Sequence, residues 1–341
     1  MSASKRKANA TVTGPLRSAS IVGTGSYLPD KVLSNVDLEK LVDTSDEWII
    51  SRTGIRERRI ANAHQYTSDL GAEAARRALA DAKVSPSKVD MIICATVTPD
   101  MPFPSTACLI QEKIGASKAV CFDLEAACSG FLFSLEVGRQ FIISKTFNTI
   151  LVVATEKLSS IVDWKDRNTC VLFGDGAGAA VLQPTDACHG ILASTMGSNG
   201  AHGNILCVPG GGSRHPASTE SIQAGLHYIK MSGKEVYKHA ILAMHQAVKD
   251  ALDRYHLKIE DITCIIPHQA NMRIIQGLAA RLGISVDKFY VNLQRYGNMS
   301  AASAAVALDE SAREGRFQRG DYILAIAFGG GVTWAASVIE W

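Results

Sequence analysis

The sequence lacks both a strong charge of one sign and a long unbroken apolar segment. Its formal net charge is only +2, while 47% of its residues are hydrophobic and 20% are charged. The stretch that comes nearest to a membrane span, YILAIAFGGGVTWAASVI at 322–339, has three central glycines and many β-formers, so it predicts strand, turn and strand. We therefore expect a globular protein that has no nucleic-acid partner and does not enter a membrane.

Closely paired cysteines are also missing. Eight cysteines occur, yet no two are spaced as CxxC, and several lie inside apolar, strand-like runs. This pattern favours buried thiols in a reducing compartment over a disulfide framework or a zinc site. The sequence therefore predicts a cytoplasmic protein without a bound metal.

Basic residues are concentrated at the N-terminus. Four Lys and Arg residues fall within the first 17 positions, whereas the first acidic residue is Asp30. This segment has no apolar run and is too polar for a secretory signal. We expect residues 1–18 to form a flexible basic extension.

Two similar series of elements follow each other along the chain. A predicted helix at 68–84 precedes the apolar strand at 91–97, and a helix at 234–255 precedes the strand at 262–267. The strand–turn–helix units that contain AACSG and GNMSA are separated by nearly the same offset along the chain. The repeat indicates a duplicated α/β fold whose mainly parallel sheets are covered by helices.

The repeat also divides the chain into domains. Residues 19–184 form the first half, which carries Cys128, and residues 231–341 form the second half. Residues 185–230 are rich in glycine and polar residues, so we expect an irregular connection between the halves and not a core element.

Cys128 stands between a predicted strand, AVCFDL, and a predicted helix that begins near Ser129. A thiol at the N-terminus of a helix is expected to have a lowered pKa and to react as a thiolate. The small neighbours in AACSG leave room for a substrate. The alternative is a buried cysteine that only fills space, which is the commoner case for a single thiol.

His268 and Asn298 occupy comparable positions. His268 follows the strand CIIP, at the end of a parallel strand where α/β proteins place their sites. Asn298 corresponds to Cys128 under the offset of the repeat, so the duplication would bring both turns to one place. A hydrogen-bonding role for His268 and a cap or turn role for Asn298 are the structural alternatives. Cys, His and Asn together also describe a thiol protease, and their spacing does not decide between these readings.

Glycines cluster at three places. Those at 329–331 allow close approach of a ligand and can offer N–H donors to an oxyanion, although a bulged turn between strands explains them equally. The segment GDGAGAA at 174–180 precedes a strand instead of a helix, and GTGSYLP is interrupted by Pro29. Neither is therefore a dinucleotide-binding fingerprint.

Seven segments together resemble β-ketoacyl-acyl-carrier-protein synthase III. They are IVGTGSYLP, TSDEWIISRTGIRERRI, AACSGF, FGDGAGAAVL, PHQANMRII, YGNMSAASAAVALDE and AFGGGVTW, and they keep the family's order from about residue 19 to the C-terminus. The resemblance implies a thiolase-like α/β fold, in which two duplicated halves form the five layers αβαβα. It also implies an acyltransferase that initiates fatty-acid synthesis.

The resemblance further implies the substrates. An acyl-coenzyme A primer, expected to be acetyl-coenzyme A, would condense with malonyl-acyl-carrier protein, and 3-oxoacyl-carrier protein, carbon dioxide and coenzyme A would be released. Coenzyme A thioester is a substrate in this reaction, so no cofactor is expected. A homodimer is expected as well.

The motifs also imply roles for individual residues. The thiol of Cys128 would accept the acyl group, His268 and Asn298 would bind the malonyl thioester carbonyl, and the N–H groups of Cys128 and Gly330 would form an oxyanion hole. The implied binding residues are, for coenzyme A, Trp48, Arg52, Arg167 and Asn271; for the acyl pocket, Phe173 and a partner subunit's copy of Phe103; and for the carrier protein, Lys238 and Arg273.

Departures from the family pattern leave alternatives open. The stretch after HQAN, GLAARLG, keeps only Arg281 where some members carry adjacent lysines, and residues 160–166 and 199–222 also differ. The alternatives are a related acyltransferase of natural-product synthesis, a thiol hydrolase and a non-catalytic partner subunit. The presence of Cys128, His268 and Asn298 argues against the last of these.

Overall fold

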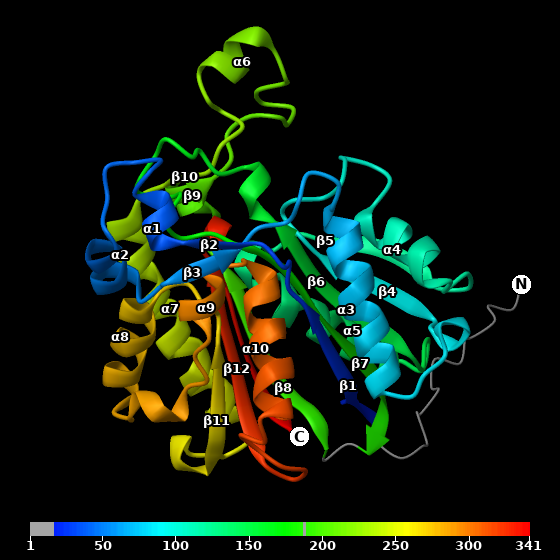
Figure 1. Cartoon of the computed structure of the whole chain (residues 1–341). Coiled ribbons are helices and arrows are strands. Elements are labelled where there is room, and N and C mark those ends of the chain that lie inside the picture. The colour runs from blue at the N-terminus through cyan, green and yellow to red at the C-terminus, as the bar shows by residue number, and fades with distance from the viewer. Residues whose placement is uncertain (1–16, 187–188) are drawn as a thin grey trace, which may run out of the picture.

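The computed structural model describes residues 17–186 and 189–341. The basic extension expected at 1–18 therefore lies almost wholly outside the described residues. The remaining chain folds into two main β-sheets that are separated and flanked by helices (Figure 1). These layers carry the residues of the site to one end of the sheets.

The first sheet has the strand order β1-β7-β6-β4-β5. Strand β4 is parallel to β5 and β6, whereas β7 is antiparallel to β6 and β1. Because successive side chains point to opposite faces, Ile93 faces the space between the sheets and Ile92 faces the outer helices. The strands are β1 (Arg17–Tyr27), β4 (Met91–Ala95), β5 (Val120–Leu124), β6 (Ile150–Lys157) and β7 (Asp175–Asp186).

The second sheet has the order β11-β12-β13-β8. Only β11 and β12 are parallel, so the expectation of mainly parallel sheets is wrong for this half. Strand β13 follows β12 after a three-residue turn, which is too short for a parallel crossover. The strands are β8 (Gly190–Ser198), β11 (Ile262–Pro267), β12 (Tyr322–Gly329) and β13 (Thr333–Glu340).

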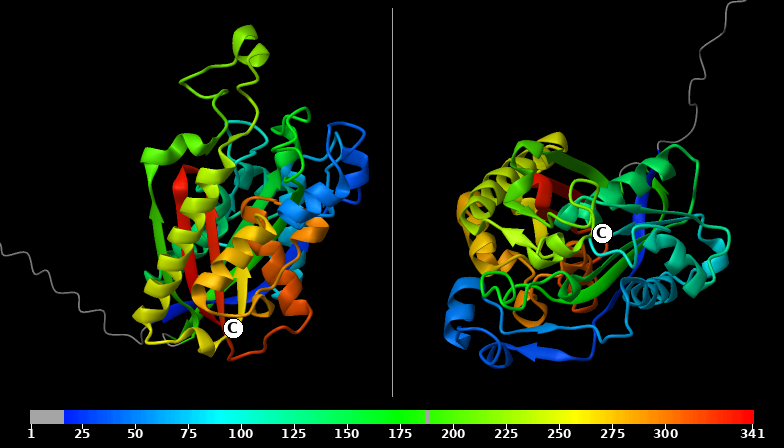
Figure 2. Two further views of the ribbon diagram at one scale, coloured as in Figure 1. Left: turned by 90° about the vertical axis from the view of Figure 1, so that its left-hand side faces the viewer. Right: turned by 90° about the horizontal axis from the view of Figure 1, so that it is seen from above.

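Three layers of helices enclose the two sheets (Figure 2). Helices α3 (Thr67–Asp81) and α4 (Thr106–Ile114) cover the outer face of the first sheet. Helices α7 (Gly233–Arg254) and α8 (Met272–Leu282) cover the outer face of the second. Helices α5 (Gly130–Ile143) and α10 (Ala301–Arg313) lie between the sheets, which gives the expected five layers αβαβα.

The two middle helices pack tightly because their contact residues are small. A Cβ atom built on Gly130 would lie 3.0 Å from that of Ala95, and one built on Gly178 would lie 2.5 Å from that of Ala305. Any larger side chain at these glycines would push a helix away from its sheet. The glycines and alanines of both turn–helix units therefore set the distance between the two halves.

The duplication is confirmed by the positions of the elements. Strands β4 and β11, helices α5 and α10, and strands β1 and β8 each begin at nearly the same separation along the chain. Strand β8 corrects the expected domain boundaries, because residues 185–230 do not form only an irregular connection. Residues 190–198 pair with β13 and belong to the second sheet. Glycine and polar residues around β8 hide this strand from periodicity.

The remaining elements are short and mostly peripheral. An arm that carries α6 stands away from the body in Figures 1 and 2. No helix among the described residues is long and apolar enough to span a membrane. The short elements are β2 (Val32–Ser34), α1 (Asn35–Leu38), α2 (Asp46–Thr53), β3 (Glu57–Arg59), β9 (Leu206–Cys207), α6 (Thr219–Gln223), β10 (Lys230–Met231), α9 (Leu293–Tyr296), and the 3₁₀ turns η1 (Pro86–Lys88), η2 (Ala127–Ser129), η3 (Leu158–Ser160), η4 (Gly200–Ile205), η5 (Ile259–Asp261), η6 (Val286–Lys288) and η7 (Gly330–Val332).

Candidate active site

Cys128 lies on a strained turn between β5 and α5. Ala127 has a φ of 46°, in the left-handed region that side chains other than glycine rarely adopt. The second half holds this turn in place, because the Thr333 hydroxyl donates a hydrogen bond to the Ala126 carbonyl at 2.9 Å. Gly329 allows the close approach, since a Cβ atom there would lie 2.5 Å from the Cys128 nitrogen. The turn is therefore fixed by residues from both halves.

His268 follows directly after β11, as expected. Its backbone N–H donates to the Ile326 carbonyl at 2.7 Å, which fixes it beside the neighbouring strand. The imidazole is buried, and its Nδ1 atom has no hydrogen-bond partner among the described residues. Burial lowers the pKa of His268 to about 4. The ring is therefore neutral at pH 7 and can act as an uncharged hydrogen-bond donor.

Asn298 is held by hydrogen bonds from its backbone and its side chain. Its N–H donates to the Leu172 carbonyl at 2.8 Å, and its carbonyl accepts the Gly174 N–H at 3.0 Å. Its side-chain oxygen accepts the backbone N–H of Ser300 at 2.8 Å. Because the oxygen is already engaged, the amide NH₂ group is the end available to a ligand.

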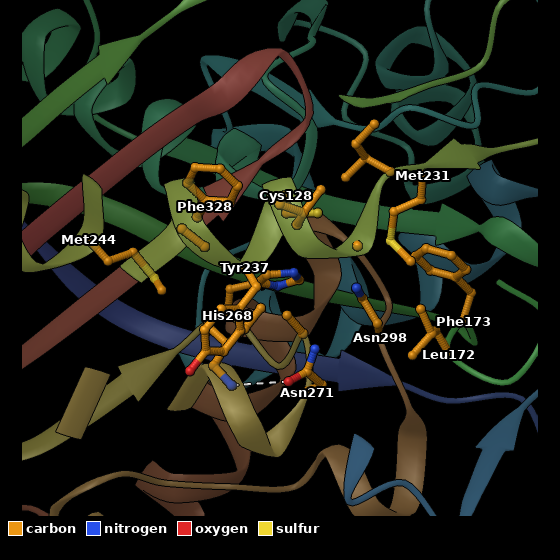
Figure 3. Close-up of a pocket in the computed structure, with 16 residues that line it drawn as sticks. Cys128, Leu172, Phe173, Met231, Tyr237, Met244, His268, Asn271, Asn298 and Phe328 are labelled. Carbon is orange, nitrogen blue, oxygen red and sulfur yellow. Dashed lines mark hydrogen bonds between the residues drawn. The ribbon is translucent and has the colours of Figure 1, made fainter. Parts of the chain in front are cut away.

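The structure brings Cys128, His268 and Asn298 to one buried cavity of about 80 Å³. Their side chains surround this space in Figure 3, and each is less than a tenth exposed. The other walls are mainly apolar and include Phe173 and Phe328. Burial among apolar walls strengthens the polar interactions inside this cavity.

The thiol of Cys128 does not have the lowered pKa that its place before a helix predicts. Burial raises the pKa of Cys128 to about 12. A helix N-terminus stabilises an anion by about 2 kcal/mol at most, which is too little to offset this change at pH 7. The thiol is therefore protonated in the unliganded site, and a base must take its proton before it can attack.

A second chamber meets the first at Cys128 and Phe173. It has a volume of about 440 Å³. Ser300, Gly330 and the strained turn contribute to its lining. The rest is largely apolar, with contributions from Val97, Leu158, Ile161, Leu206, Val208 and Ile229. This apolar lining suits an acyl chain. Among its apolar side chains, the sequence motifs had indicated only Phe173.

Three of the four residues expected to bind coenzyme A lie together. The guanidinium carbons of Arg167 and Arg52 lie 4.3 and 4.9 Å from the ring centroid of Trp48. Arg167 therefore covers a face of the indole that an adenine ring would need. Asn271 lies elsewhere, at the N-terminus of α8, where its side-chain oxygen accepts the Ile274 N–H at 3.0 Å (dashed line in Figure 3). It lines the buried cavity beside His268.

A shallow basic depression of about 700 Å³ continues from Asn271 to the surface. Arg52 and Arg273 line it, together with Lys234. Arg273 is exposed, as expected for a contact with an acidic carrier protein. Lys238 is exposed as well but is not part of this lining, which contains Lys234 instead.

Phe103 stands apart from its own chain's cavity. Its side chain is 83% exposed, in the loop before α4, and it lines neither chamber. A phenylalanine this exposed has lost nearly all the stabilisation that burial would give it. Its position agrees with a role toward another molecule and not toward its own site.

Sequence reasoning also missed two polar residues behind Cys128. Glu156 lies at the end of β6, and Ser300 comes directly before α10. Both are buried, with exposed fractions of 0% and 3%. A glutamate at the end of a strand is normally a surface residue, and a serine before a helix is normally a helix cap. No signal in the sequence alone distinguishes Glu156 and Ser300 from such ordinary residues.

Two duplicated α/β halves that meet at a Cys–His–Asn cavity define a thiolase-fold acyltransferase of the condensing type. Family models for 3-oxoacyl-[acyl-carrier-protein] synthase III match residues 122–200, and those for its C-terminal part match residues 252–341. The chain is 55% identical to the β-ketoacyl-[acyl-carrier-protein] synthase III of Caldanaerobacter subterraneus subsp. tengcongensis over 95% of this chain and 98% of that protein. The chain belongs to the 3-oxoacyl-[acyl-carrier-protein] synthase III family.

Solved structures agree with this assignment. The crystal structure of 3-oxoacyl-[acyl-carrier-protein] synthase III from Aquifex aeolicus matches with a TM-score of 0.87 and 46% identity, over 95% of this chain and all of that one. The priming β-ketosynthase of the R1128 polyketide biosynthetic pathway matches with a TM-score of 0.88 and 35% identity, over 96% and 98% of the two chains. The fold is therefore shared by enzymes of more than one pathway.

Proposed function

We propose that this protein transfers an acyl group from coenzyme A to Cys128 and condenses it with malonyl-acyl-carrier protein. The observation that carries the proposal is the meeting of two chambers at Cys128. One chamber has apolar walls, and the other contains His268 and Asn298. An acyl group on the thiol fits the chamber with apolar walls, and a thioester that enters the chamber with His268 and Asn298 would reach both polar side chains.

The first half-reaction forms the acyl-enzyme. Cys128 attacks the thioester carbonyl, a C–S bond forms, and coenzyme A leaves as its thiolate, which solvent protonates. The backbone N–H groups of Cys128 and Gly330 stabilise the oxyanion. Donors of this kind contribute about 3–4 kcal/mol each in comparable sites.

The second half-reaction joins the two carbon chains. The malonyl thioester oxygen accepts hydrogen bonds from His268 and Asn298, carbon dioxide leaves, and the enolate carbon attacks the acyl-Cys128 carbonyl. Neither donor needs to change its protonation state, because burial holds the pKa of His268 at about 4. A thiol protease, in contrast, needs a histidine that takes up the proton of the nucleophile.

The substrates enter along the surface that leads to Asn271. We assign the aromatic and cationic group of Trp48, Arg52 and Arg167 to coenzyme A, with acetyl-coenzyme A as the primer. Arg273 and Lys238 are assigned to the acidic carrier protein. Coenzyme A thioester acts as a substrate, so the proposed reaction needs no metal and no cofactor, and a chelator such as EDTA should leave the rate unchanged.

The functional form is a homodimer in the cytoplasm. Strand β5 ends the first sheet with an exposed edge, where Val120 is 50% exposed, and Phe103 is exposed near it in sequence. Pairing of two β5 edges would cover these residues and bring the partner's Phe103 toward the acyl chamber. The cysteines of the described residues are free, in agreement with a reducing compartment. Sedimentation of the purified chain should give twice the monomer mass.

A natural-product acyltransferase is the second candidate. The likeness to a priming ketosynthase of polyketide synthesis supports it, because that enzyme shares the fold over almost the whole chain. The two functions differ in the carrier protein and primer that they prefer, so competition between carrier proteins of the two pathways separates them.

Intact-protein mass spectrometry tests the proposal. The protein is incubated with acyl-coenzyme A thioesters of increasing length, and malonyl-acyl-carrier protein is then added. We expect a mass gain on Cys128 that is discharged into a 3-oxoacyl product. Discharge only by water would indicate a hydrolase, and the absence of any gain in folded protein would contradict the role of Cys128.

A further inference from the structure

The buried thiol of Cys128 needs a group that takes its proton. Burial raises the pKa of Cys128 to about 12, so the attacking thiolate does not form unaided near pH 7. His268 is a poor acceptor, because burial lowers its pKa to about 4. A further group beside the thiol must therefore serve, and Glu156 is in a position to do so.

Glu156 is a carboxylate enclosed at the ends of β4 and β6. It accepts hydrogen bonds from the Thr98 hydroxyl at 2.7 Å, the Thr96 hydroxyl at 3.1 Å and the Val97 N–H at 3.1 Å. All of these donors are neutral. Burial raises the pKa of Glu156 to about 7, so this carboxyl group gains and loses a proton in the range where such enzymes work.

Ser300 connects this carboxylate with the thiol. Its hydroxyl is buried and makes no hydrogen bond of ordinary geometry among the described residues. It lines the larger chamber together with Cys128, and it is close enough to Cys128 and to Glu156 to lower the pKa of each. Ser300 has a φ of 48°, a strained value that the fold maintains directly behind the nucleophile. An unpaired hydroxyl between an acid and a thiol is suited to pass a proton in either direction.

We propose that Ser300 and Glu156 form a proton relay for Cys128. During acylation the Cys128 S–H bond breaks, Ser300 Oγ accepts that proton, and the hydroxyl proton of Ser300 moves to the Glu156 carboxylate. The thiolate forms the new C–S bond. During condensation the C–S bond breaks, and the departing thiolate recovers a proton from Glu156 by the reverse path. Charge and protons balance in each step.

A purely structural role for Glu156 predicts the opposite effect. The negative charge of Glu156 raises the pKa of Cys128, so removing that charge would make the thiol more reactive if Glu156 did nothing else. A relay predicts a slower reaction when the same charge is removed. The sign of the effect therefore separates the two roles.

Few other titratable groups interfere with this test. The buried thiol of Cys94 senses the charge of Glu156, but its pKa is raised well above the ordinary value by burial. Glu125, exposed at the chamber wall, raises the pKa of Cys128. Its backbone neighbour Ala127 donates an N–H to its carboxylate at 2.9 Å. A change in rate near pH 7 is therefore assigned to Glu156.

The experiment measures the rate at which acetyl-coenzyme A acetylates Cys128, by quenched mass spectrometry between pH 5.5 and 9. We compare the wild type with Glu156→Gln, Glu156→Asp and Ser300→Ala. The matched control is Glu136→Gln, which removes another buried carboxylate that pairs with Arg139 on α5. Iodoacetamide labelling of Cys128 and thermal unfolding verify a reachable thiol and a folded chain.

The relay predicts that the wild-type rate rises with pH through about 7, where Glu156 loses its proton. Glu156→Gln should be slower by about 100-fold and lose this rise, since general bases contribute on the order of 100-fold or more. Ser300→Ala should be slower by about 10-fold or more, Glu156→Asp should recover most of the rate, and Glu136→Gln should match the wild type.

The inference rests on the proposed acylation of Cys128, and the outcomes keep the two apart. If the wild type itself accepts no acetyl group, the proposed function is wrong. If the wild type is acetylated but Glu156→Gln reacts as fast or faster, the relay alone is wrong. If Glu156→Gln does not fold, Ser300→Ala decides, and a wild-type rate in that variant overturns the relay.

Discussion

The two strand–turn–helix units at the site are copies of one element with different chemistry. Cys128 lies two residues before α5, and Asn298 lies three residues before α10. Each turn contains a strained residue with positive φ, Ala127 in the first and Ser300 in the second. The first unit presents a nucleophile and the second presents hydrogen-bond donors. Duplication thus supplied one geometry twice, and substitution divided the tasks between the copies.

The largest expected effect comes from a substitution in the first unit. Replacing Cys128 by alanine should abolish covalent acylation, because among the described residues Cys128 is the only thiol that lines both chambers. Intact mass after incubation with acetyl-coenzyme A measures this. A variant that still gained the acetyl mass would show that the nucleophile lies elsewhere.

Loss of either hydrogen-bond donor, His268 or Asn298, should spare the first half-reaction. His268→Ala and Asn298→Ala should still become acetylated on Cys128 but should decarboxylate malonyl-acyl-carrier protein about 100- to 1,000-fold more slowly, the usual cost of losing an oxyanion donor. Release of labelled carbon dioxide measures the second step. Equal loss of both steps in a folded variant would contradict this division.

The halves should also respond oppositely to pH. Burial lowers the pKa of His268 from 6.5 to about 4, so its contribution to stability is present above pH 6.5 and is lost as pH falls to 4. Burial raises the pKa of Glu156 from 4.5 to about 7, so its contribution is present below pH 4.5 and is lost as pH rises to 7. Each change is on the order of 3 kcal/mol, and in the wild type they largely cancel between pH 4.5 and 6.5.

Chemical denaturation at several pH values tests this cancellation. In Glu156→Gln the stability should fall as pH decreases from 6.5, and in His268→Asn it should fall as pH increases from 4.5. If both variants follow the wild-type curve, the two groups do not have these pKa values.

The smallest expected effect lies outside both units, at the coenzyme A site. Trp48→Ala should raise the KM for acetyl-coenzyme A by about 10-fold, because the loss of a stacking surface costs on the order of 1–2 kcal/mol. The kcat should not change, and the KM for a primer that lacks adenine should be the same in the variant and in the wild type. Steady-state kinetics with both primers measure this. An equal rise in KM for both primers would contradict the assignment of Trp48 to the adenine.

The repeat in the sequence was sufficient to predict duplicated α/β halves covered by helices, whereas the five layers αβαβα were implied by the family resemblance. The strand at 262–267 and the order of the elements agree with the prediction, because apolar periodicity and a constant offset report them directly. Strand β8 was missed because its apolar residues Ile191, Leu192 and Met196 do not alternate regularly with polar ones, and its pairing with β13 shows that it is a strand. Sequence periodicity cannot show a partner strand that lies at the opposite end of the same half.

The site could be predicted only in part, for a similar reason. Cys128, His268 and Asn298 stand at recognisable turns, and the structure places them together. The raised pKa of Cys128 and the roles of Ser300 and Glu156 depend on burial by residues from both halves. The identity of a side chain does not report its burial, so the pattern suggested a thiolate where the structure has a protonated thiol.

The exposed edge strand β5 of the first sheet has no counterpart at the matching position of the second sheet. Strand β5 is at least partly exposed along its length, whereas the matching position beside β11 is reduced to a single bridge between Ile265 and Phe289. In the proposed dimer, association through β5 would stop at two copies, because each copy would pair its exposed β5 edge with the other and leave none for a third. The asymmetry between the halves favours a closed pair over a growing fibre.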